Sequence, residues 1–123
     1  MRPSFALTAA LLLLAGCARG GGQPPNDEAV ARAATLKPAD AHLAVLYASA
    51  CHACHGQPGT GAPLAGDHVA WDPRWAKGLP ALTASVVGGY RGMPAGGQCF
   101  ACTRADYGAL IRFMAGRDAP ATH

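Results

Sequence analysis

The segment Cys51-His52-Ala53-Cys54-His55 holds the residues best suited to chemistry. Its pattern, C-x-x-C-H, is typical of covalent haem attachment, in which each thiol forms a thioether and the adjacent histidine binds the iron. Cysteines three positions apart on a helical turn lie on one side of it, so both can reach the porphyrin edge. The motif predicts that Cys51 and Cys54 hold a haem and that His55 is an iron ligand. A redox-active thiol pair, half of a zinc site and a chance match stay open on the motif alone.

A second protein ligand is usual for the iron of an electron-transfer haem. The other histidines and methionines of the chain are His42, His52, His68, His123, Met1, Met93 and Met114. Met114 lies on an apolar helical stripe, where a core position is favoured. Met93 lies in a loop between Gly92 and Pro94, 38 positions after His55, which is far enough to reach the opposite face of the haem. We therefore predict Met93 as the second ligand, with His68 as the main alternative.

The elements around the motif follow from apolar spacing and from glycine and proline. Leu43, Leu46, Tyr47 and Ala50 recur with helical spacing, which predicts a helix that begins near Pro38 and leads into the motif. The segment after the motif is rich in glycine and proline and predicts a loop along one haem edge.

A backbone carbonyl of this loop is expected to accept the Nδ1–H of His55 and so fix the imidazole ring. Pro63 is the candidate for that carbonyl.

The rest of the folded part reads as short helices. Residues 71–78 and 79–87 predict two of them, with Pro73 early in the first. A last helix is expected to follow a cap formed by Thr103 and Asp106, to carry an apolar stripe over residues 107–114 and to end at Gly116. The sequence shows no strand-like alternation, so the predicted fold class is all-α.

The N-terminus has the layout of an export signal. One basic side chain precedes an apolar run over residues 5–14, which is short for a membrane span. The run ends in Leu14-Ala15-Gly16-Cys17, which resembles a bacterial lipobox. We expect residues 1–16 to be a lipoprotein signal peptide and Cys17 to carry the lipid; ordinary cleavage that leaves a free Cys17 is the alternative. Export would also place the cysteines where disulfides persist.

The remaining domain boundaries follow from composition. Residues 17–36 are expected to be the lipidated cysteine and a flexible tether, with at most a helical turn or two in residues 28–35. Residues 37–118 are expected to be the folded domain and residues 119–123 a short tail. With 123 residues the core is thin, so a covalent haem would add much of its apolar volume. The formal charge of +3 suggests no nucleic-acid surface.

Several segments together resemble class I cytochromes c, most closely bacterial cytochrome c5, over about residues 38–116. They are CHACH at 51–55, GAPLAGD at 61–67, WDPRWAKG at 71–78, GMP at 92–94 and GGQCFAC at 96–102. The resemblance implies a small all-α fold of short helices and Gly/Pro loops around one covalent haem c. One departure is Gly88-Gly89, where an Asn-Gly pair is common, and we expect it to loosen the loop before Met93.

The resemblance also implies roles for individual residues. His55 and Met93 would be the iron ligands, and the Pro63 carbonyl would bind His55. Trp71 and Arg74 would lie near a haem propionate. Tyr47 and Phe113 would mark the crossing of the first and last helices.

Cys99 and Cys102 would form a disulfide, by the same resemblance. Two alternatives stay open for this pair: a redox-active dithiol at a helix start, and a four-cysteine zinc site with Cys51 and Cys54. The first lacks a preceding strand pattern, and the second needs an unusually long gap between the two pairs.

The function expected from these observations is that of a membrane-tethered electron carrier and not an enzyme. It would carry single electrons between redox partners of a bacterial respiratory chain, docking transiently at the haem edge. Its place would be the periplasmic side of a bacterial membrane, held by the lipid. Without a run of like charges, docking is expected to depend only mildly on salt. The alternative is a haem enzyme or a gas- or peroxide-binding protein in which Met93 is a labile ligand.

Overall fold

The structure, a computed structural model, describes residues 23–118. The predicted signal peptide over residues 1–16, the lipidation of Cys17 and the tail over residues 119–123 lie outside the described residues.

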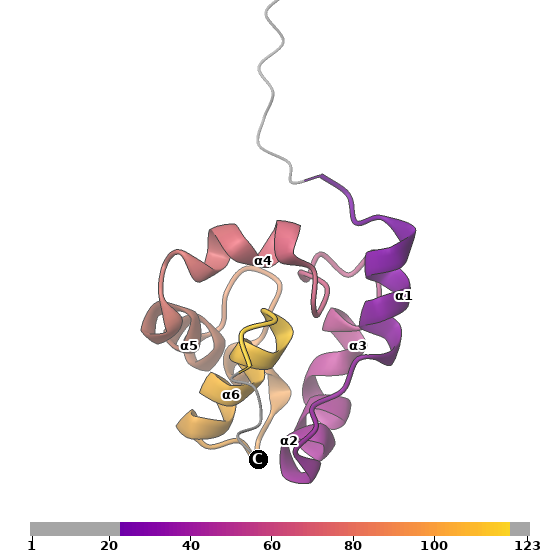
Figure 1. The fold of residues 1–123 in the computed structure, drawn as a ribbon. Coiled ribbons are helices and arrows are strands. Elements are labelled where there is room, and N and C mark those ends of the chain that lie inside the picture. The colour runs from indigo at the N-terminus through magenta and orange to yellow at the C-terminus, as the bar shows by residue number, and fades with distance from the viewer. Residues whose placement is uncertain (1–22, 119–123) are drawn as a thin grey trace, which may run out of the picture.

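Within residues 23–118 the chain is all-helical, as predicted, with a single isolated bridge between Tyr90 and Met93 in place of any strand. The α-helices are α1 (Asp27–Thr35), α2 (Ala41–Leu46), α3 (His52–His55), α4 (His68–Trp75), α5 (Leu79–Gly88) and α6 (Arg104–Met114). A π-helical turn, η1 (Tyr47–Cys51), and a 3-10 turn, η2 (Ala95–Gln98), complete the elements. In Figure 1, α2 and α3 form one side of the domain, α5 lies on the other, and α6 lies between them.

The predicted helix into the motif is present, as α2, η1 and α3 in unbroken succession. Its start differs from the prediction, because the Asp40 side chain accepts the backbone N–H of Leu43 at 2.8 Å and caps the helix there. Pro38 therefore precedes the helix. The π turn was not predicted either: the His52 N–H reaches back to the carbonyl of Tyr47, five residues earlier.

The core forms where α6 packs against α2 and η1. Leu110, Ile111 and Met114 of α6 are buried, which confirms the predicted core position of Met114. The rings of Tyr47 and Phe113 meet edge to face with centroids 4.9 Å apart, at the predicted crossing.

The predicted capping box is present at the start of α6. The Asp106 carboxylate accepts the Thr103 backbone N–H at 2.8 Å, and the Thr103 hydroxyl accepts the Asp106 backbone N–H at 3.2 Å. These bonds from Thr103, followed by those from His42, lower the pKa of Asp106, so the cap is lost only as the pH falls below the usual carboxylate range.

The helix predicted over residues 71–78 begins earlier and ends earlier, as α4 over His68–Trp75. The Asp67 side chain accepts the Val69 N–H at 3.1 Å and sets this start. Pro73 consequently lies inside the helix. The following helix, α5, matches the prediction, with Pro80 in its first turn and Gly89 at φ 84° just after its end.

A docked helix, α1, stands where residues 27–36 were predicted to belong to a flexible tether. The Asn26 side chain accepts the Ala29 N–H at 2.8 Å and caps it. Ala33 is fully buried, and Leu36 packs against the core so closely that a Cβ on Gly66 would lie 3.2 Å from its methyl group. The sequence signal was the asparagine followed by Asp27 and Glu28 in the first turn, which suits the helix dipole. Figure 1 shows α1 alongside α3.

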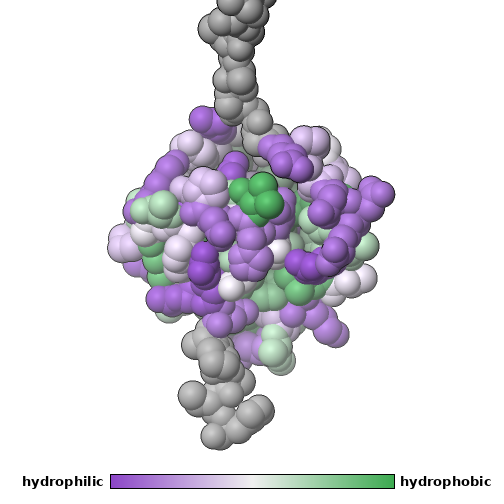
Figure 2. Space-filling model, turned by 45° about the horizontal axis from the view of Figure 1, so that its top comes forward, coloured by the Kyte–Doolittle hydropathy of each residue, from purple (hydrophilic) through white to green (hydrophobic). Residues whose placement is uncertain are grey.

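Among residues 23–118, none of the helices has the length and apolar character needed to cross a membrane. On the face drawn in Figure 2, polar side chains surround the exposed apolar ones.

We predict that Ala33→Asp detaches α1, because the substitution would bury a charge without a partner. Amide exchange over residues 28–36 should become at least about tenfold faster, equivalent to about 1.4 kcal/mol of lost protection. Ala31→Asp, on the exposed side of the same helix, is the matched control and should leave this exchange nearly unchanged. Equal protection in the two variants would contradict the docking of α1.

Candidate functional site

His55 is a buried histidine at the end of α3 whose ring orientation is fixed by the following loop. Its Nδ1 lies 2.8 Å from the carbonyl oxygen of Pro63, the bond that we predicted. Because a carbonyl can only accept, Nδ1 carries the hydrogen and Nε2 keeps its lone pair. The Ala65 N–H also donates to the His55 carbonyl at 2.8 Å, so the loop holds both the ring and the backbone of this residue.

The surroundings of His55 favour its neutral form. Burial lowers the pKa of the imidazole, the Pro63 hydrogen bond opposes this in part, and the Arg74 charge lowers it further. A neutral imidazole with a free Nε2 is the form that binds a metal ion.

Two unpaired thiols precede this histidine in the chain. Cys51 is partly buried at the end of the π turn, and Cys54 is exposed on α3. Burial raises the pKa of the Cys51 thiol to about 11, with a further contribution from nearby Cys54. Cys51 is therefore a protonated thiol at neutral pH, which does not suit a redox-active thiol pair.

A buried hydroxyl lies on the same π turn. The Tyr47 side chain is 1% exposed, and its hydroxyl has no hydrogen-bond partner within residues 23–118. Burial raises its pKa to about 12. An orphaned polar atom of this kind needs a partner from outside the protein side chains, such as water or a bound group. The two thiols, the imidazole with a free Nε2 and this hydroxyl are a donor set that fits a covalent haem.

Trp71 and Arg74 of α4 are the residues for which the resemblance implied a place near a propionate, and the structure puts the Trp71 ring and the Arg74 charge near His55. The Trp71 ring is 6.0 Å from the His55 ring, centroid to centroid, and its Nε1–H donates to the Leu64 carbonyl at 2.8 Å. That donor is consequently used within the protein. The Arg74 guanidinium donates to the Ala70 carbonyl of its own helix and is exposed, so it can reorient toward an anionic group. A propionate contact by either residue stays a prediction.

Met93 lies in a tight turn and is partly buried. The N–H and C=O groups of Tyr90 and Met93 bond reciprocally, at 2.9 and 3.0 Å. Gly89 supports the turn: it has a φ of 84°, and a Cβ there would lie 3.1 Å from the Ala95 nitrogen. Gly89 therefore permits a close approach of two segments, and the expected loosening of the loop by the Gly88-Gly89 pair stays a prediction.

The alternative ligands occupy other settings. His68, at the start of α4, is about half exposed, with Nδ1 3.5 Å from Asp72, and its ring lies against Gly116. His42 lies on α2 and is exposed, as expected, but its Nε2 is 3.0 Å from Asp106 of α6. This link could not be predicted from the sequence, because the two residues are 64 positions apart.

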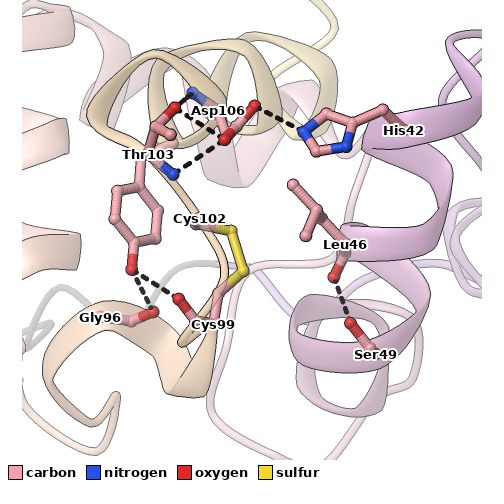
Figure 3. Close-up of a disulfide and its surroundings, with 9 residues drawn as sticks. His42, Leu46, Ser49, Gly96, Cys99, Cys102, Thr103 and Asp106 are labelled. Atoms are coloured by element: carbon pink, nitrogen blue, oxygen red, sulfur yellow. Dashed lines mark hydrogen bonds and ion pairs between the residues drawn. A yellow bond between two sulfur atoms is a disulfide. The ribbon is translucent and has the colours of Figure 1, made fainter.

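The second cysteine pair forms a disulfide, as the resemblance implied (Figure 3). Because both sulfur atoms are used in this bond, Cys99 and Cys102 cannot be ligands of a four-cysteine zinc site. The Tyr107 hydroxyl, which lies 3.0 Å from the Gly96 carbonyl and 3.1 Å from that of Cys99, connects the same segment to α6. The segment that follows Met93 is thus held to the last helix at two points.

Comparison with known proteins decides the family. Residues 38–114 match the family described as cytochrome C oxidase, cbb3-type, subunit III. The chain is also 37% identical over 75 residues to cytochrome c-555 of Chlorobaculum thiosulfatiphilum, an alignment that covers 58% of this chain and 87% of the relative. The chain belongs to the cytochrome c family.

Family membership assigns chemistry to the motif. The cytochrome c family implies covalent haem c, and Cys51 and Cys54 fit its C-x-x-C-H attachment pattern. Members are typically electron carriers and not enzymes. Helix α1 precedes the residues that match the family.

We predict that the Cys99→Ser/Cys102→Ser protein keeps its haem and loses stability. Opening so short a loop should lower the free energy of unfolding by about 2 kcal/mol, measured by urea denaturation of the holoprotein. Native protein with the disulfide chemically reduced should show the same decrease in the free energy of unfolding as the double variant. Release of haem from the double variant would contradict a purely structural disulfide.

Proposed function

We propose that this protein is a monohaem c-type cytochrome, most like cytochrome c5, that carries single electrons between protein partners while tethered to a membrane. The observation that carries the proposal is His55, a buried, neutral imidazole whose ring is fixed by the Pro63 carbonyl and which directly follows two free thiols in the chain. In a family of electron carriers, this arrangement suits a permanent iron ligand.

Each residue of the site has a separate role in the proposed haem centre. When bound, haem supplies a one-electron Fe(III)/Fe(II) couple. Cys51 and Cys54 hold it covalently, and His55 binds the iron from one face. The Pro63 carbonyl keeps the imidazole in one tautomer and orientation, which also raises its basicity as a ligand.

Met93 is proposed as the ligand on the other face. Its turn is held by the Tyr90 pairing on one side and by the disulfide-linked segment on the other. A thioether ligand favours Fe(II) and raises the potential relative to a second histidine. With both iron positions filled by protein, no position is left for a substrate, and Arg91 is the charged neighbour of Met93 in the sequence.

We predict that Met93→Ala protein keeps its covalent haem but binds carbon monoxide rapidly when reduced, because one iron position is then open. The native protein should bind it at least about tenfold more slowly at neutral pH. Met114→Leu, a core substitution of similar volume, is the matched control and should behave as native protein. Rapid binding by the native protein would contradict the closed site and favour a gas-binding or enzymatic role.

The tether is proposed to run from a lipid on Cys17 to the start of α1. The support is the lipobox resemblance and the Gly- and Pro-rich composition of residues 18–25. Because α1 is docked, the tether runs only over the ten positions from Cys17 to Asp27, which span at most about 35 Å when fully extended. We infer that the domain works within that distance of a bacterial membrane, on its periplasmic side, with components of a respiratory chain as transient partners.

The Cys17→Ser protein tests this tether. Membrane preparations should oxidise the lipidated protein at least about tenfold faster than the unlipidated protein at equal bulk concentration, because the anchor raises the local concentration. Ferricyanide should oxidise both proteins at one rate, which shows that the haem site is unchanged. Equal rates with the membranes would count against a functional tether.

A further inference from the structure

The side chain of Phe100 is the most exposed apolar group in the part of the chain that the structure describes. It is 98% exposed, although its neighbours Cys99 and Cys102 are joined by the disulfide. The Tyr107 hydroxyl bonds the Cys99 carbonyl, and the Cys102 N–H donates to the same carbonyl at 3.1 Å. Phe100 is therefore held out on a short, cross-linked loop. Because the backbone of this loop is already restrained, little backbone entropy is lost when a partner covers the side chain.

Phe100 belongs to a longer exposed segment that also carries Met93. We name residues 87–101 the Met93 segment. Two of its other large side chains are exposed as well, Val87 by 39% and Tyr90 by 46%. Arg91 and Gln98 are its polar side chains, and the rest are apolar residues and glycines. Exposed aromatic side chains that a partner buries on binding contribute much of the binding free energy of protein interfaces.

The charge of the surrounding chain is strongly segregated. Residues 73–105 contain no aspartate or glutamate. They do contain four cations, all of them exposed, which are Arg74, Lys77, Arg91 and Arg104. Five of the seven acidic residues precede residue 73, and the other two follow residue 105. The overall charge of +3 conceals this separation.

Two of these cations lie next to the exposed ring of Tyr90. The Lys77 Nζ is 5.7 Å and the Arg91 Cζ 5.3 Å from the centroid of the Tyr90 ring. Arg104, at the start of α6, is four positions from Phe100. Cations beside apolar anchors favour a partner whose own apolar contact area has an acidic rim. Two copies of this chain would place like charges face to face, which disfavours self-association here.

We propose that the Met93 segment is the docking surface for an acidic redox protein, with Phe100 as its apolar anchor and the cations of residues 73–105 as its rim. This inference rests on the proposed electron-carrier function. It also revises the expectation from the sequence: docking should depend strongly on salt, because the charges that face the partner have one sign.

Plastocyanin, an acidic single-electron copper protein, is a suitable probe. The second-order rate constant for oxidation of the reduced holoprotein is measured by stopped flow. Phe100→Ser should lower it at least about fivefold, equivalent to about 1 kcal/mol. Val69→Ser is the matched control, because Val69 is 66% exposed but lies on α4 beside α1, and it should change the rate less than about twofold. Equal effects of the two substitutions would overturn the proposal.

The cationic rim is tested by a second matched pair. Arg91→Gln should lower the rate constant and flatten its dependence on salt, whereas Arg112→Gln, an exposed arginine of α6 outside residues 73–105, should do neither. For native protein, the rate should fall roughly tenfold between low and physiological salt. A rate that is independent of salt would contradict the acidic partner.

Two measurements separate this inference from the proposed function. Ferricyanide should oxidise Phe100→Ser protein at the native rate; failure of all forms to react would reject the carrier function itself. A titration of isotope-labelled holoprotein with redox-inactive, cadmium-substituted plastocyanin should shift amide signals mainly in residues 87–101. Shifts centred elsewhere, or a native dimer that Phe100→Ser abolishes in sedimentation, would overturn the docking surface.

Discussion

The hydrogen bond from His55 Nδ1 to the Pro63 carbonyl is the interaction on which the rest of the site depends. It determines which ring nitrogen is free, and burial together with Arg74 keeps that nitrogen unprotonated. The bond exists because the loop after the motif folds back over α3. There the Ala65 N–H donates to the His55 carbonyl, and the Leu64 carbonyl accepts the indole N–H of Trp71. A short Gly- and Pro-rich loop thus positions the His55 imidazole and the adjacent Trp71 together.

The domain adds two restraints to this centre from opposite ends of the chain. Helix α1 lies against the motif, where the His52 Nε2 is 3.1 Å from the Ala34 carbonyl, and against Gly66 of the loop. On the other side, the disulfide and Tyr107 hold the Met93 segment to α6. A carrier of single electrons benefits from such restraint, because its ligand geometry must change little between oxidation states. The segment that carries Met93, the proposed second ligand, also presents the exposed aromatic groups, so the proposed ligation and the proposed docking share one element.

Much of the fold was predictable because it follows from local patterns. The C-x-x-C-H motif, the Pro63 hydrogen bond, the Thr103–Asp106 capping box and the core position of Met114 all depend on residues near in sequence or on one helical face. The π turn was not predictable, since apolar spacing does not report a shift from i−4 to i−5 bonding. Helix α1 was missed because its own apolar content is low, and its stability comes from Ala33 and Leu36 meeting a distant loop. The segregation of charge was present in the sequence, and the exposure of Phe100 gives it a functional meaning.

A redox titration of the native protein, followed in the visible and near-infrared, tests the central claim most directly. The account predicts one reversible one-electron wave in the haem bands. A near-infrared sulfur-to-iron band of the oxidised form should disappear with the same midpoint. Two waves, or oxidised protein without the sulfur-to-iron band, would contradict a single haem ligated by His55 and Met93.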